Sequence, residues 1–199
     1  MSLDTPLILI GPAATGKSTL GEIVAANLSV PFVDIDEIAE PYYEESGWNL
    51  EKLAHRSSVV GRVAAEREWE GARAHAVCRV LEEHPDAVIA LGAGHTSYKN
   101  ENHLQRVGNA LKDAPCVLLV LPSADRAEAL STLRNRSLES KATDWISSGH
   151  DFLAEWLDDQ GTRSLATEIM ITGSETPELT AKRIVAMLQH TSSWVTTGD

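Results

Sequence analysis

The segment GPAATGKST at residues 11–19 combines glycines, a lysine and hydroxyls in an order that suits anion binding. Gly11 and Gly16, followed by Lys17 and Ser18, satisfy the pattern G-x-x-x-x-G-K-[ST]. Glycines let the backbone curl so that successive N–H groups point inward, and a helix N-terminus adds partial positive charge. We therefore expect this loop to hold nucleotide phosphates. The Lys17 ammonium would reach the β and γ phosphates, and the Ser18 hydroxyl would bind Mg²⁺.

The alternative for this segment is a glycine-rich turn that carries an exposed lysine. At average residue frequencies, a chance match to the pattern occurs on the order of once per hundred chains of this length. The apolar run LILI before the loop and the helical pattern after it make a chance match rarer still. The position of the loop between a strand and a helix favours phosphate binding.

Two carboxylates follow the next short apolar run, in VDIDE at residues 33–37. Asp34 would hold Mg²⁺ through water, while Asp36 would accept a hydrogen bond from an attacking hydroxyl. The alternative is that either aspartate caps the following helix. The phosphate loop next door in the expected sheet favours the chemical interpretation. Because the guanine-reading motif N-K-x-D is absent from the chain, the pair indicates a kinase rather than a GTPase.

Strands and helices must bring these side chains to one edge of a sheet. Short apolar runs alternate with helical patterns, and the runs predict strands at 6–10, 31–34, 87–91, 116–121 and 168–172. Helices are predicted at 17–28, 58–83, 104–111, 126–133 and after the pair Thr176-Pro177. Strands that are apolar on both faces and separated by helices predict a parallel sheet covered on both sides. We expect one α/β domain over residues 1–199, with five parallel strands.

Composition and charge limit the possible partners. The chain has 199 residues, 43% of them hydrophobic and 23% charged, as is typical of a globular protein. A net charge of −12 would repel nucleic acid and anionic lipid, so we expect neither as a partner. Cys78 and Cys116 sit in apolar contexts without metal-ligand spacing, which suggests buried reduced thiols. With no signal-peptide pattern and no run long enough to span a bilayer, we expect a cytoplasmic protein.

The order of these motifs resembles that of shikimate kinase and its relatives among the small P-loop kinases. The stretch GPAATGKSTLGEIVAANLSVPFVDIDE carries most of the resemblance, followed by AVIALGAG, an arginine-bearing polar span and a terminal strand and helix. It covers about residues 7–188. The resemblance implies a three-layer P-loop kinase sandwich, with the five strands in the order 2-3-1-4-5 and a mobile lid at about 134–150. It also implies transfer of a phosphoryl group from ATP, with Mg²⁺, to a small-molecule hydroxyl.

The resemblance assigns roles position by position. Asp34 would belong to the magnesium shell together with Ser18, and Asp36 would contact the acceptor hydroxyl. Arg136, in LRNRSLES, matches a lid arginine that closes over the phosphates, and Arg134 is a second candidate. The alternative for both arginines is solvated charge on a mobile loop. The ATP phosphates would be held by Gly11, Ala14, Thr15, Gly16, Lys17, Ser18 and Thr19.

The residues around the expected acceptor site both match and depart from the family pattern. Gly92, Ala93 and Gly94 stand where the family has three glycines that line this site. Ala93 is tolerable in the middle position only if its φ is negative. His95 follows directly, so it should project toward the acceptor, where a histidine can donate a hydrogen bond or move a proton.

Two arginines that grip the substrate carboxylate in shikimate kinases have no counterparts at the matching positions. Those positions fall near residues 70–71 and 158–159, and the second holds two aspartates, which would repel a carboxylate. Arg67, Arg73 and Arg163 are the arginines close enough to substitute. The usual clamp for shikimate is therefore absent from the expected register.

Other residues suggest a different acceptor pocket. His150 and Asp151, with Trp145 and Trp156, indicate aromatic walls and several carboxylates, which suit a polyhydroxylated, neutral or cationic acceptor. Taken singly, each of the four is also explained as a surface residue or a core tryptophan. Three hypotheses follow: a shikimate-kinase-like enzyme for another hydroxylated metabolite, shikimate kinase itself, or a nucleotide-binding regulatory protein. We expect a monomer or a small homo-oligomer.

Overall fold

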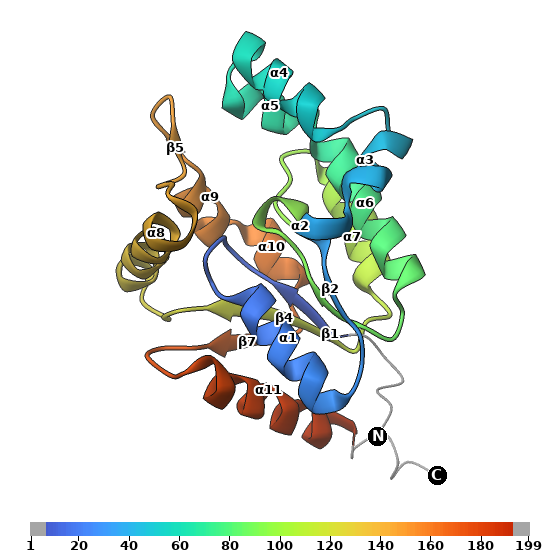
Figure 1. Ribbon diagram of the computed structural model, residues 1–199, viewed down its shortest axis with the longest axis vertical. Coiled ribbons are helices and arrows are strands. Elements are labelled where there is room, and N and C mark those ends of the chain that lie inside the picture. Colours follow the sequence, from blue (N-terminus) through green and yellow to red (C-terminus); the bar gives the residue numbers. More distant parts are fainter. Residues whose placement is uncertain (1–6, 193–199) are drawn as a thin grey trace.

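A computed structural model describes residues 7–192, and its centre is a five-stranded parallel sheet (Figure 1). The strands lie in the order β2-β3-β1-β4-β7. A separate two-stranded antiparallel sheet, β5-β6, precedes β7 in the chain, so β7 is the fifth strand of the large sheet and the predicted order is confirmed. The strands are β1 Leu7–Ile10, β2 Phe32–Asp34, β3 Val88–Ala90, β4 Cys116–Leu121, β5 Ile146–Ser147, β6 His150–Asp151 and β7 Glu168–Ile171.

Helices separate the strands as predicted, but the short helices within 35–45 and 152–165 were not predicted, and the predicted long helix is divided. Instead of one helix over 58–83 there are three, because Gly61, with φ +87°, ends α4, and Trp69 separates α5 from α6. Pro6, which the predicted first strand includes, lies outside the described residues. The helices are α1 Lys17–Leu28, α2 Ile35–Ile38, α3 Glu40–Glu45, α4 Leu50–Val60, α5 Arg62–Glu68, α6 Glu70–Glu83, α7 Glu101–Leu111, α8 Arg126–Lys141, α9 Phe152–Asp158, α10 Gln160–Leu165 and α11 Pro177–Ser192.

The central strands are apolar on both faces because helices cover both. Along β1, Ile8 and Ile10 belong to one core cluster and Leu7 and Leu9 to the other, as the two-residue period of a strand requires. The first cluster includes side chains of α6, α8 and α9, and the second includes side chains of α1 and α11. Figure 1 shows α1 and α11 on one face of the sheet and α6 and α7 on the other. The predicted three-layer α/β sandwich is confirmed.

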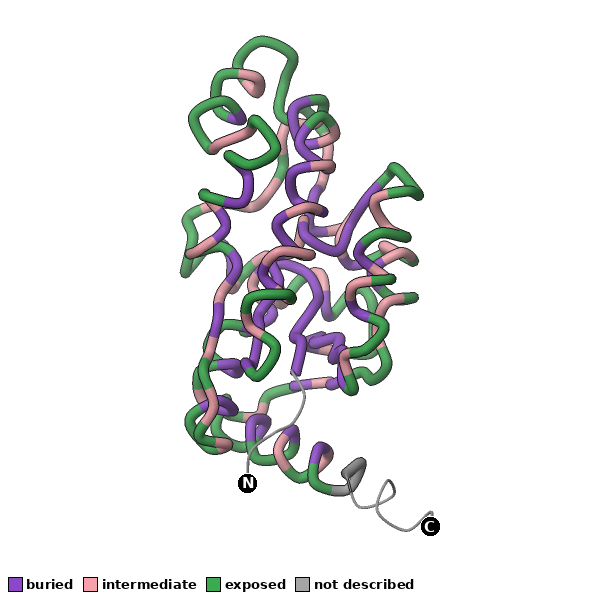
Figure 2. Tube along the Cα trace, turned by 90° about the vertical axis from the view of Figure 1, so that its right-hand side faces the viewer, coloured by how far each residue is buried: buried purple, intermediate pink, exposed green. Residues whose placement is uncertain are grey.

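The parallel register brings the ends of three strands to one edge. Leu9 of β1 pairs with Ala90 of β3, and Asp34 of β2 pairs with the same alanine. The phosphate loop therefore leaves β1 beside the carboxyl ends of β2 and β3, where ligands bind in such sheets. Figure 2 shows the buried interior of the chain, with many exposed residues in the projecting α4–α5 pair. Within residues 7–192, no helix combines the length and the apolar character needed to cross a bilayer.

Candidate active site

The phosphate loop, residues 11–19, adopts backbone angles that require glycine at its two ends. Gly11 has φ +131°, and a Cβ on it would lie 2.7 Å from the carbonyl oxygen of Val120. Gly16 has φ +90° and precedes α1 without a side-chain cap. Since no side chain takes the first N–H groups of this twelve-residue helix, they are left to bind an anion.

The Lys17 side chain lies across the loop that precedes it. Its Nζ donates hydrogen bonds to the carbonyl oxygens of Gly11, at 2.9 Å, and of Pro12, at 2.8 Å. Burial lowers the pKa of Lys17 to about 8, against an opposing effect of the Asp36 carboxylate. Thr15 Oγ1 donates to the same Pro12 carbonyl, which stiffens the loop. The ammonium is therefore held at the mouth of the loop, where phosphate oxygens could replace the two carbonyls.

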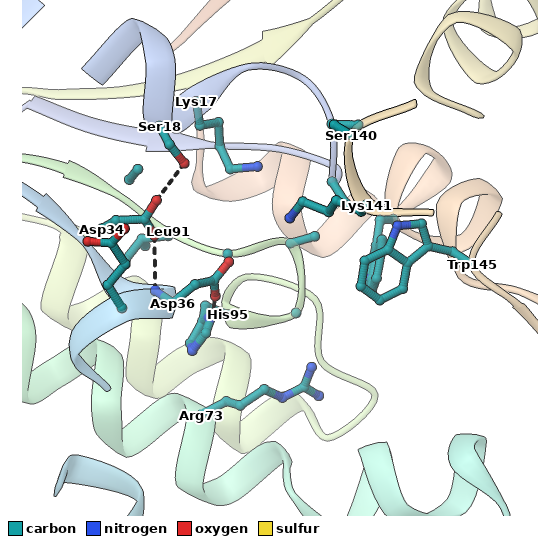
Figure 3. A pocket seen from close by; sticks show the side chains of 18 of the residues that line it. Lys17, Ser18, Asp34, Asp36, Arg73, Leu91, His95, Ser140, Lys141 and Trp145 are labelled. Atoms are coloured by element: carbon teal, nitrogen blue, oxygen red, sulfur yellow. Dashed lines mark hydrogen bonds and ion pairs between the residues drawn. The ribbon is translucent and has the colours of Figure 1, made fainter. Parts of the chain in front are cut away.

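Ser18 and Asp34 join the phosphate loop to the end of β2. The Ser18 hydroxyl donates to Asp34 Oδ2 at 2.5 Å, and the other oxygen, Oδ1, accepts from the backbone N–H of Asp36 at 3.0 Å (Figure 3). Asp34 therefore caps α2 with one oxygen, as the alternative interpretation expected, and meets Ser18 with the other.

A hydroxyl and a carboxylate oxygen are the hard ligands that Mg²⁺ prefers, so the Ser18–Asp34 pair fits this ion. Among the residues that the structure describes, no group of three or more His, Cys, Asp or Glu is arranged to bind a metal. The protein would thus supply few ligands, and phosphates and water the rest, which is how Mg²⁺ is usually bound beside nucleotides.

Asp36 faces the glycine-rich turn that follows β3. Its side chain is 57% exposed, and a Cβ on Gly92 would lie 2.2 Å from Asp36 Oδ1 and 2.7 Å from His95 Nδ1. A Cβ on Gly94 would lie 2.1 Å from Nη1 of Arg73. Ala93 meets the condition placed on it, since it is not among the described residues with positive φ. The two outer glycines are therefore required for close approach, and the middle position is not.

His95 is buried, with 3% of its surface exposed. Its Nε2 lies 2.6 Å from the Tyr43 hydroxyl, and its Nδ1 lies 3.6 Å from Asp36 Oδ1 without a hydrogen-bond partner. Burial lowers the pKa of His95 to about 4, so the ring is neutral at pH 7. Sequence reasoning directed His95 toward the expected acceptor site, and the structure places it next to Asp36 and also next to Tyr43, which the sequence analysis did not name.

One cavity of about 820 Å³ connects these groups (Figure 3). Three predicted site residues, Gly11, Thr15 and Arg134, are not part of its lining. The others all line it: Ala14, Gly16, Lys17, Ser18, Thr19, Asp34, Asp36, Gly92, Ala93, Gly94, His95 and Arg136. Predicted site residues separated by up to 122 positions in the chain thus share one space.

The sequence profile described as shikimate kinase matches residues 13–189. The chain belongs to the shikimate kinase family. It is 32% identical to Shikimate kinase 2 of Escherichia coli over 93 residues, which cover 46% of each chain. It is 29% identical to the pentafunctional AROM polypeptide of Schizosaccharomyces pombe over 123 residues, 60% of this chain and 7% of that one. The regions that match therefore span less than half the length of either curated relative.

Solved structures agree with the family in fold. Shikimate kinase from Acinetobacter baumannii, in complex with shikimate, has a TM-score of 0.67 at 17% identity over 95% of both chains. Shikimate kinase from Aquifex aeolicus has a TM-score of 0.58 at 20% identity, covering 94% of this chain and 98% of that one. A gluconokinase from Sinorhizobium meliloti has a TM-score of 0.52 at 13% identity, over 98% and 99%. These likenesses support the P-loop kinase fold.

The two candidate lid arginines of this shikimate kinase family member lie in different surroundings. Arg136 of α8 lines the cavity, whereas Arg134 forms an ion pair with Asp151 and is not part of the lining. The predicted lid, about 134–150, corresponds to the second half of α8 and the β5-β6 hairpin up to His150. Of the two arginines, therefore, only Arg136 faces the cavity.

The two tryptophans line the cavity and also pack against each other. Trp145 and Trp156 meet edge to face with ring centroids 5.0 Å apart, and the Trp145 indole N–H donates to Ser137 at 2.7 Å. His150 instead bonds to Glu155 at 2.5 Å, away from the lining. The aromatic wall is therefore present, while the predicted histidine and Asp151 do not contribute to it.

The expectation that Asp158 and Asp159 border the acceptor is wrong. Asp158 forms an ion pair with Arg126 at 2.6 Å, and Asp159 caps α10 by accepting from the N–H of Gly161 at 2.9 Å. Neither lines the cavity, nor does Arg163. The short helices α9 and α10, which the sequence did not predict, place these two side chains in those contacts instead.

At the acceptor end of the cavity, sequence reasoning named Arg73 as a possible clamp but missed Glu40, Glu66 and Trp69. Besides His95 Nδ1, three buried polar atoms there have no hydrogen-bond partner: Glu40 Oε2, Trp69 Nε1 and Arg73 Nε. Glu66, which faces Arg73 at 3.5 Å, lines the cavity with them. One signal was available, since Glu66 and Arg73 are seven positions apart and so share a helical face with the apolar Trp69. Charges on a buried face are uncommon without a function.

Proposed function

We propose that this chain transfers the γ-phosphoryl group of ATP, with Mg²⁺, to a hydroxyl of a small metabolite. The observation that carries the proposal is the shared cavity, in which Lys17 and Ser18 of the phosphate loop and Asp36 face one space. Membership of the shikimate kinase family supports the same reaction. The intact aspartate pair argues against a regulatory protein without catalysis.

Each residue has a part in this proposal. The first N–H groups of α1 and the Lys17 ammonium would bind phosphate oxygens and neutralise their charge. Asp36 would accept a hydrogen bond from the acceptor hydroxyl and orient it for in-line attack. Arg136 would approach the phosphates when the lid closes. Mg²⁺, held through Ser18 and Asp34, would offset charge on the transferred group.

The charges at the acceptor end favour a neutral or cationic polyol. Glu66 is 2.7 Å from Arg62 and 3.5 Å from Arg73, so it neutralises part of both guanidinium charges. Glu40 offers a free acceptor atom, while Trp69 and Arg73 each offer a free donor. Buried donors and acceptors without partners are costly unless a ligand binds them. The hydroxyl groups of a polyol both donate and accept hydrogen bonds, so they would supply partners to all three of these atoms.

Shikimate is a second candidate acceptor, because Arg73 lines the cavity with its Nε unpartnered. The other arginines considered for a carboxylate clamp are less suitable. Arg67 is bound to Glu155 at 2.6 Å, and Arg163 is not in the lining. A carboxylate on Arg73 would also have to approach Glu66, so binding of shikimate is expected to be weaker than that of a neutral polyol.

The test measures ADP release from Mg·ATP in the presence of shikimate, gluconate, neutral polyols and amino sugars. We expect a neutral or amino-substituted polyol to stimulate release more than either carboxylate does. A preference for shikimate would select the second candidate. Tight ATP binding with no stimulation by any acceptor would contradict the kinase proposal and favour a regulatory protein. Cytoplasmic location and a monomer or small homo-oligomer stay predictions.

A matched pair of variants separates catalysis from folding. Lys17→Ala is expected to lower turnover at least about 100-fold, because the developing charge on the phosphoryl group loses its ammonium partner. Lys112→Ala removes an exposed lysine at the end of α7 and should leave turnover unchanged. Near-normal activity of Lys17→Ala would overturn the mechanism.

A further inference from the structure

His95 lies between a phenol and a carboxylate, deep in the acceptor end of the cavity. One ring nitrogen, Nε2, is bonded to the Tyr43 hydroxyl at 2.6 Å. The other, Nδ1, is buried without a partner and faces Asp36 Oδ1 at 3.6 Å. Figure 3 shows His95 and Asp36 directed toward each other from the turn after β3 and from α2. An unpartnered buried nitrogen aimed at the expected catalytic carboxylate needs an explanation.

The neighbouring groups determine which nitrogen carries the hydrogen. Burial raises the pKa of Tyr43 above its usual range, so the phenol keeps its proton and can donate to Nε2. Nδ1 then carries the ring hydrogen and directs it at Asp36. The opposite tautomer would turn the Nδ1 lone pair toward the negative Asp36 carboxylate, which is electrostatically unfavourable.

Burial is the main reason that the ring stays neutral. It lowers the pKa of His95 more than the Asp36 carboxylate raises it, and the positive charges of Arg73 and Lys17 add smaller effects in the same direction as burial. A neutral ring has one N–H, so the direction of that single donor matters for the site.

We propose that His95 is a positioning residue. Its Nδ1–H, directed by Tyr43, donates a hydrogen bond to Asp36 Oδ1 and leaves Oδ2 free to accept a hydrogen bond from the substrate hydroxyl. This inference rests on the proposed kinase function in assigning Asp36 its role. Gly92 makes the contact possible, because a Cβ there would lie 2.2 Å from the carboxylate and 2.7 Å from the ring. The 3.6 Å separation is expected to shorten when substrate binds, as catalytic hydrogen bonds commonly do.

The first test reads the tautomer directly and needs no substrate. Nitrogen-15 NMR of the full chain with labelled histidine, at pH 7, reports which ring nitrogen carries hydrogen, and His95→Asn identifies the signal by its loss. We expect the Nδ1–H tautomer in the unmodified protein. In Tyr43→Phe we expect a changed Nε2 signal and a measurable population of the Nε2–H form. An Nε2–H tautomer in the unmodified protein would overturn the inference, whatever the enzyme's acceptor is.

The second test asks whether asparagine, a smaller hydrogen-bond donor, restores the activity that is lost without histidine. It uses whichever hydroxylated compound supports ADP release in the assay described above. His95→Leu removes the donor and should lower kcat about tenfold or more, with KM for ATP changed less than about threefold. His95→Asn returns an N–H near the Nδ1 position and should recover most of the lost kcat. His55→Asn, at an exposed histidine of α4, is the matched control.

A purely structural role for His95 predicts a different outcome. If the ring only fills space, both substitutions should lower thermal stability and kcat in parallel, and Asn should rescue nothing. That result would contradict the positioning role. If no acceptor supports turnover, the kinase proposal fails on its own, while the NMR test still decides the tautomer.

Discussion

The hydroxyl of Ser18 donates to Oδ2 of Asp34 across 2.5 Å and so joins the start of α1 to the end of β2. The two residues are sixteen positions apart, and the parallel sheet brings them together. The other Asp34 oxygen is already engaged with the backbone N–H of Asp36. The Asp34 carboxylate therefore orients both Ser18, its partner in the proposed metal site, and the turn that carries Asp36.

Asp34→Asn should raise the Mg²⁺ concentration needed for half-maximal activity by about tenfold or more, because an amide is a weaker ligand and lacks negative charge. The measurement is an ADP-release assay at fixed ATP over a magnesium titration. Asp86→Asn, at an exposed aspartate before β3, is the control and should leave the titration unchanged. An unaltered magnesium dependence in Asp34→Asn would remove Asp34 from the metal site.

The depressed pKa of Lys17 predicts opposite effects of pH on binding and on stability. Above a pKa of about 8, the folded protein loses the Lys17 proton while the unfolded chain keeps it up to 10.5. Raising the pH from 8 to 10.5 therefore removes a buried charge and increases the contribution of Lys17 to the free energy of unfolding. Over the same range, affinity for Mg·ATP should fall by up to about tenfold per pH unit.

Calorimetric binding of Mg·ATP and denaturant unfolding between pH 7 and 10 test this prediction. Lys17→Met is the reference, and the stability difference between it and the unmodified protein should change in favour of the lysine as pH rises. An ATP dissociation constant that is flat from pH 7 to 10 would be incompatible with a pKa of about 8 for Lys17.

Gly94→Ala should cost about 1–3 kcal/mol of stability, because its Cβ would lie 2.1 Å from Nη1 of a buried arginine. Arg73 has little room to move, since it packs over Trp69 at 5.4 Å and over Tyr98 at 5.9 Å. Ala93→Gly, the neighbouring change, should cost about 0.5–1 kcal/mol through chain entropy alone. Chemical denaturation of both variants measures the difference, and equal losses would argue against a clash with Arg73.

Glu155 should stabilise the fold above pH 4.5 and lose that effect as the pH falls toward 2. Burial opposes ionisation, but hydrogen bonds from Lys99, Arg67 and His150 outweigh it and hold the pKa of Glu155 at about 2. The folded state therefore favours the charged form below the ordinary pKa of 4.5. Glu155→Gln should cost about 2 kcal/mol at pH 7 and almost nothing near pH 2.

Unfolding of Glu155→Gln in denaturant at a series of pH values checks the prediction. Glu82→Gln is the comparison, because Glu82 is 68% exposed in its side chain and its ion pair with Arg79 should contribute little. If the Glu155→Gln deficit persisted unchanged to pH 2, packing rather than charge would explain it.

Local patterns in the sequence were enough to predict the sheet and the donor site. Apolar runs identified all five strands, and the loop from Gly11 to Ser18 carried its chemistry in contiguous residues. The helix prediction over 58–83 failed at Gly61, since a single glycine within a helical pattern does not by itself signal a break. The short helices α9 and α10 were missed for the related reason that six or seven residues hold too little periodicity.

The sequence by itself determined the strand positions, the phosphate loop and the aspartate pair, because these depend on residue types at fixed local spacings, while the strand order followed from the family resemblance. Tertiary structure decided the acceptor end. It brought Tyr43 to His95 across 52 positions, buried Arg73 in the cavity and paired Asp158 with Arg126 instead. A side chain's partner depends on how helices pack and where short turns direct them, which no local spacing encodes.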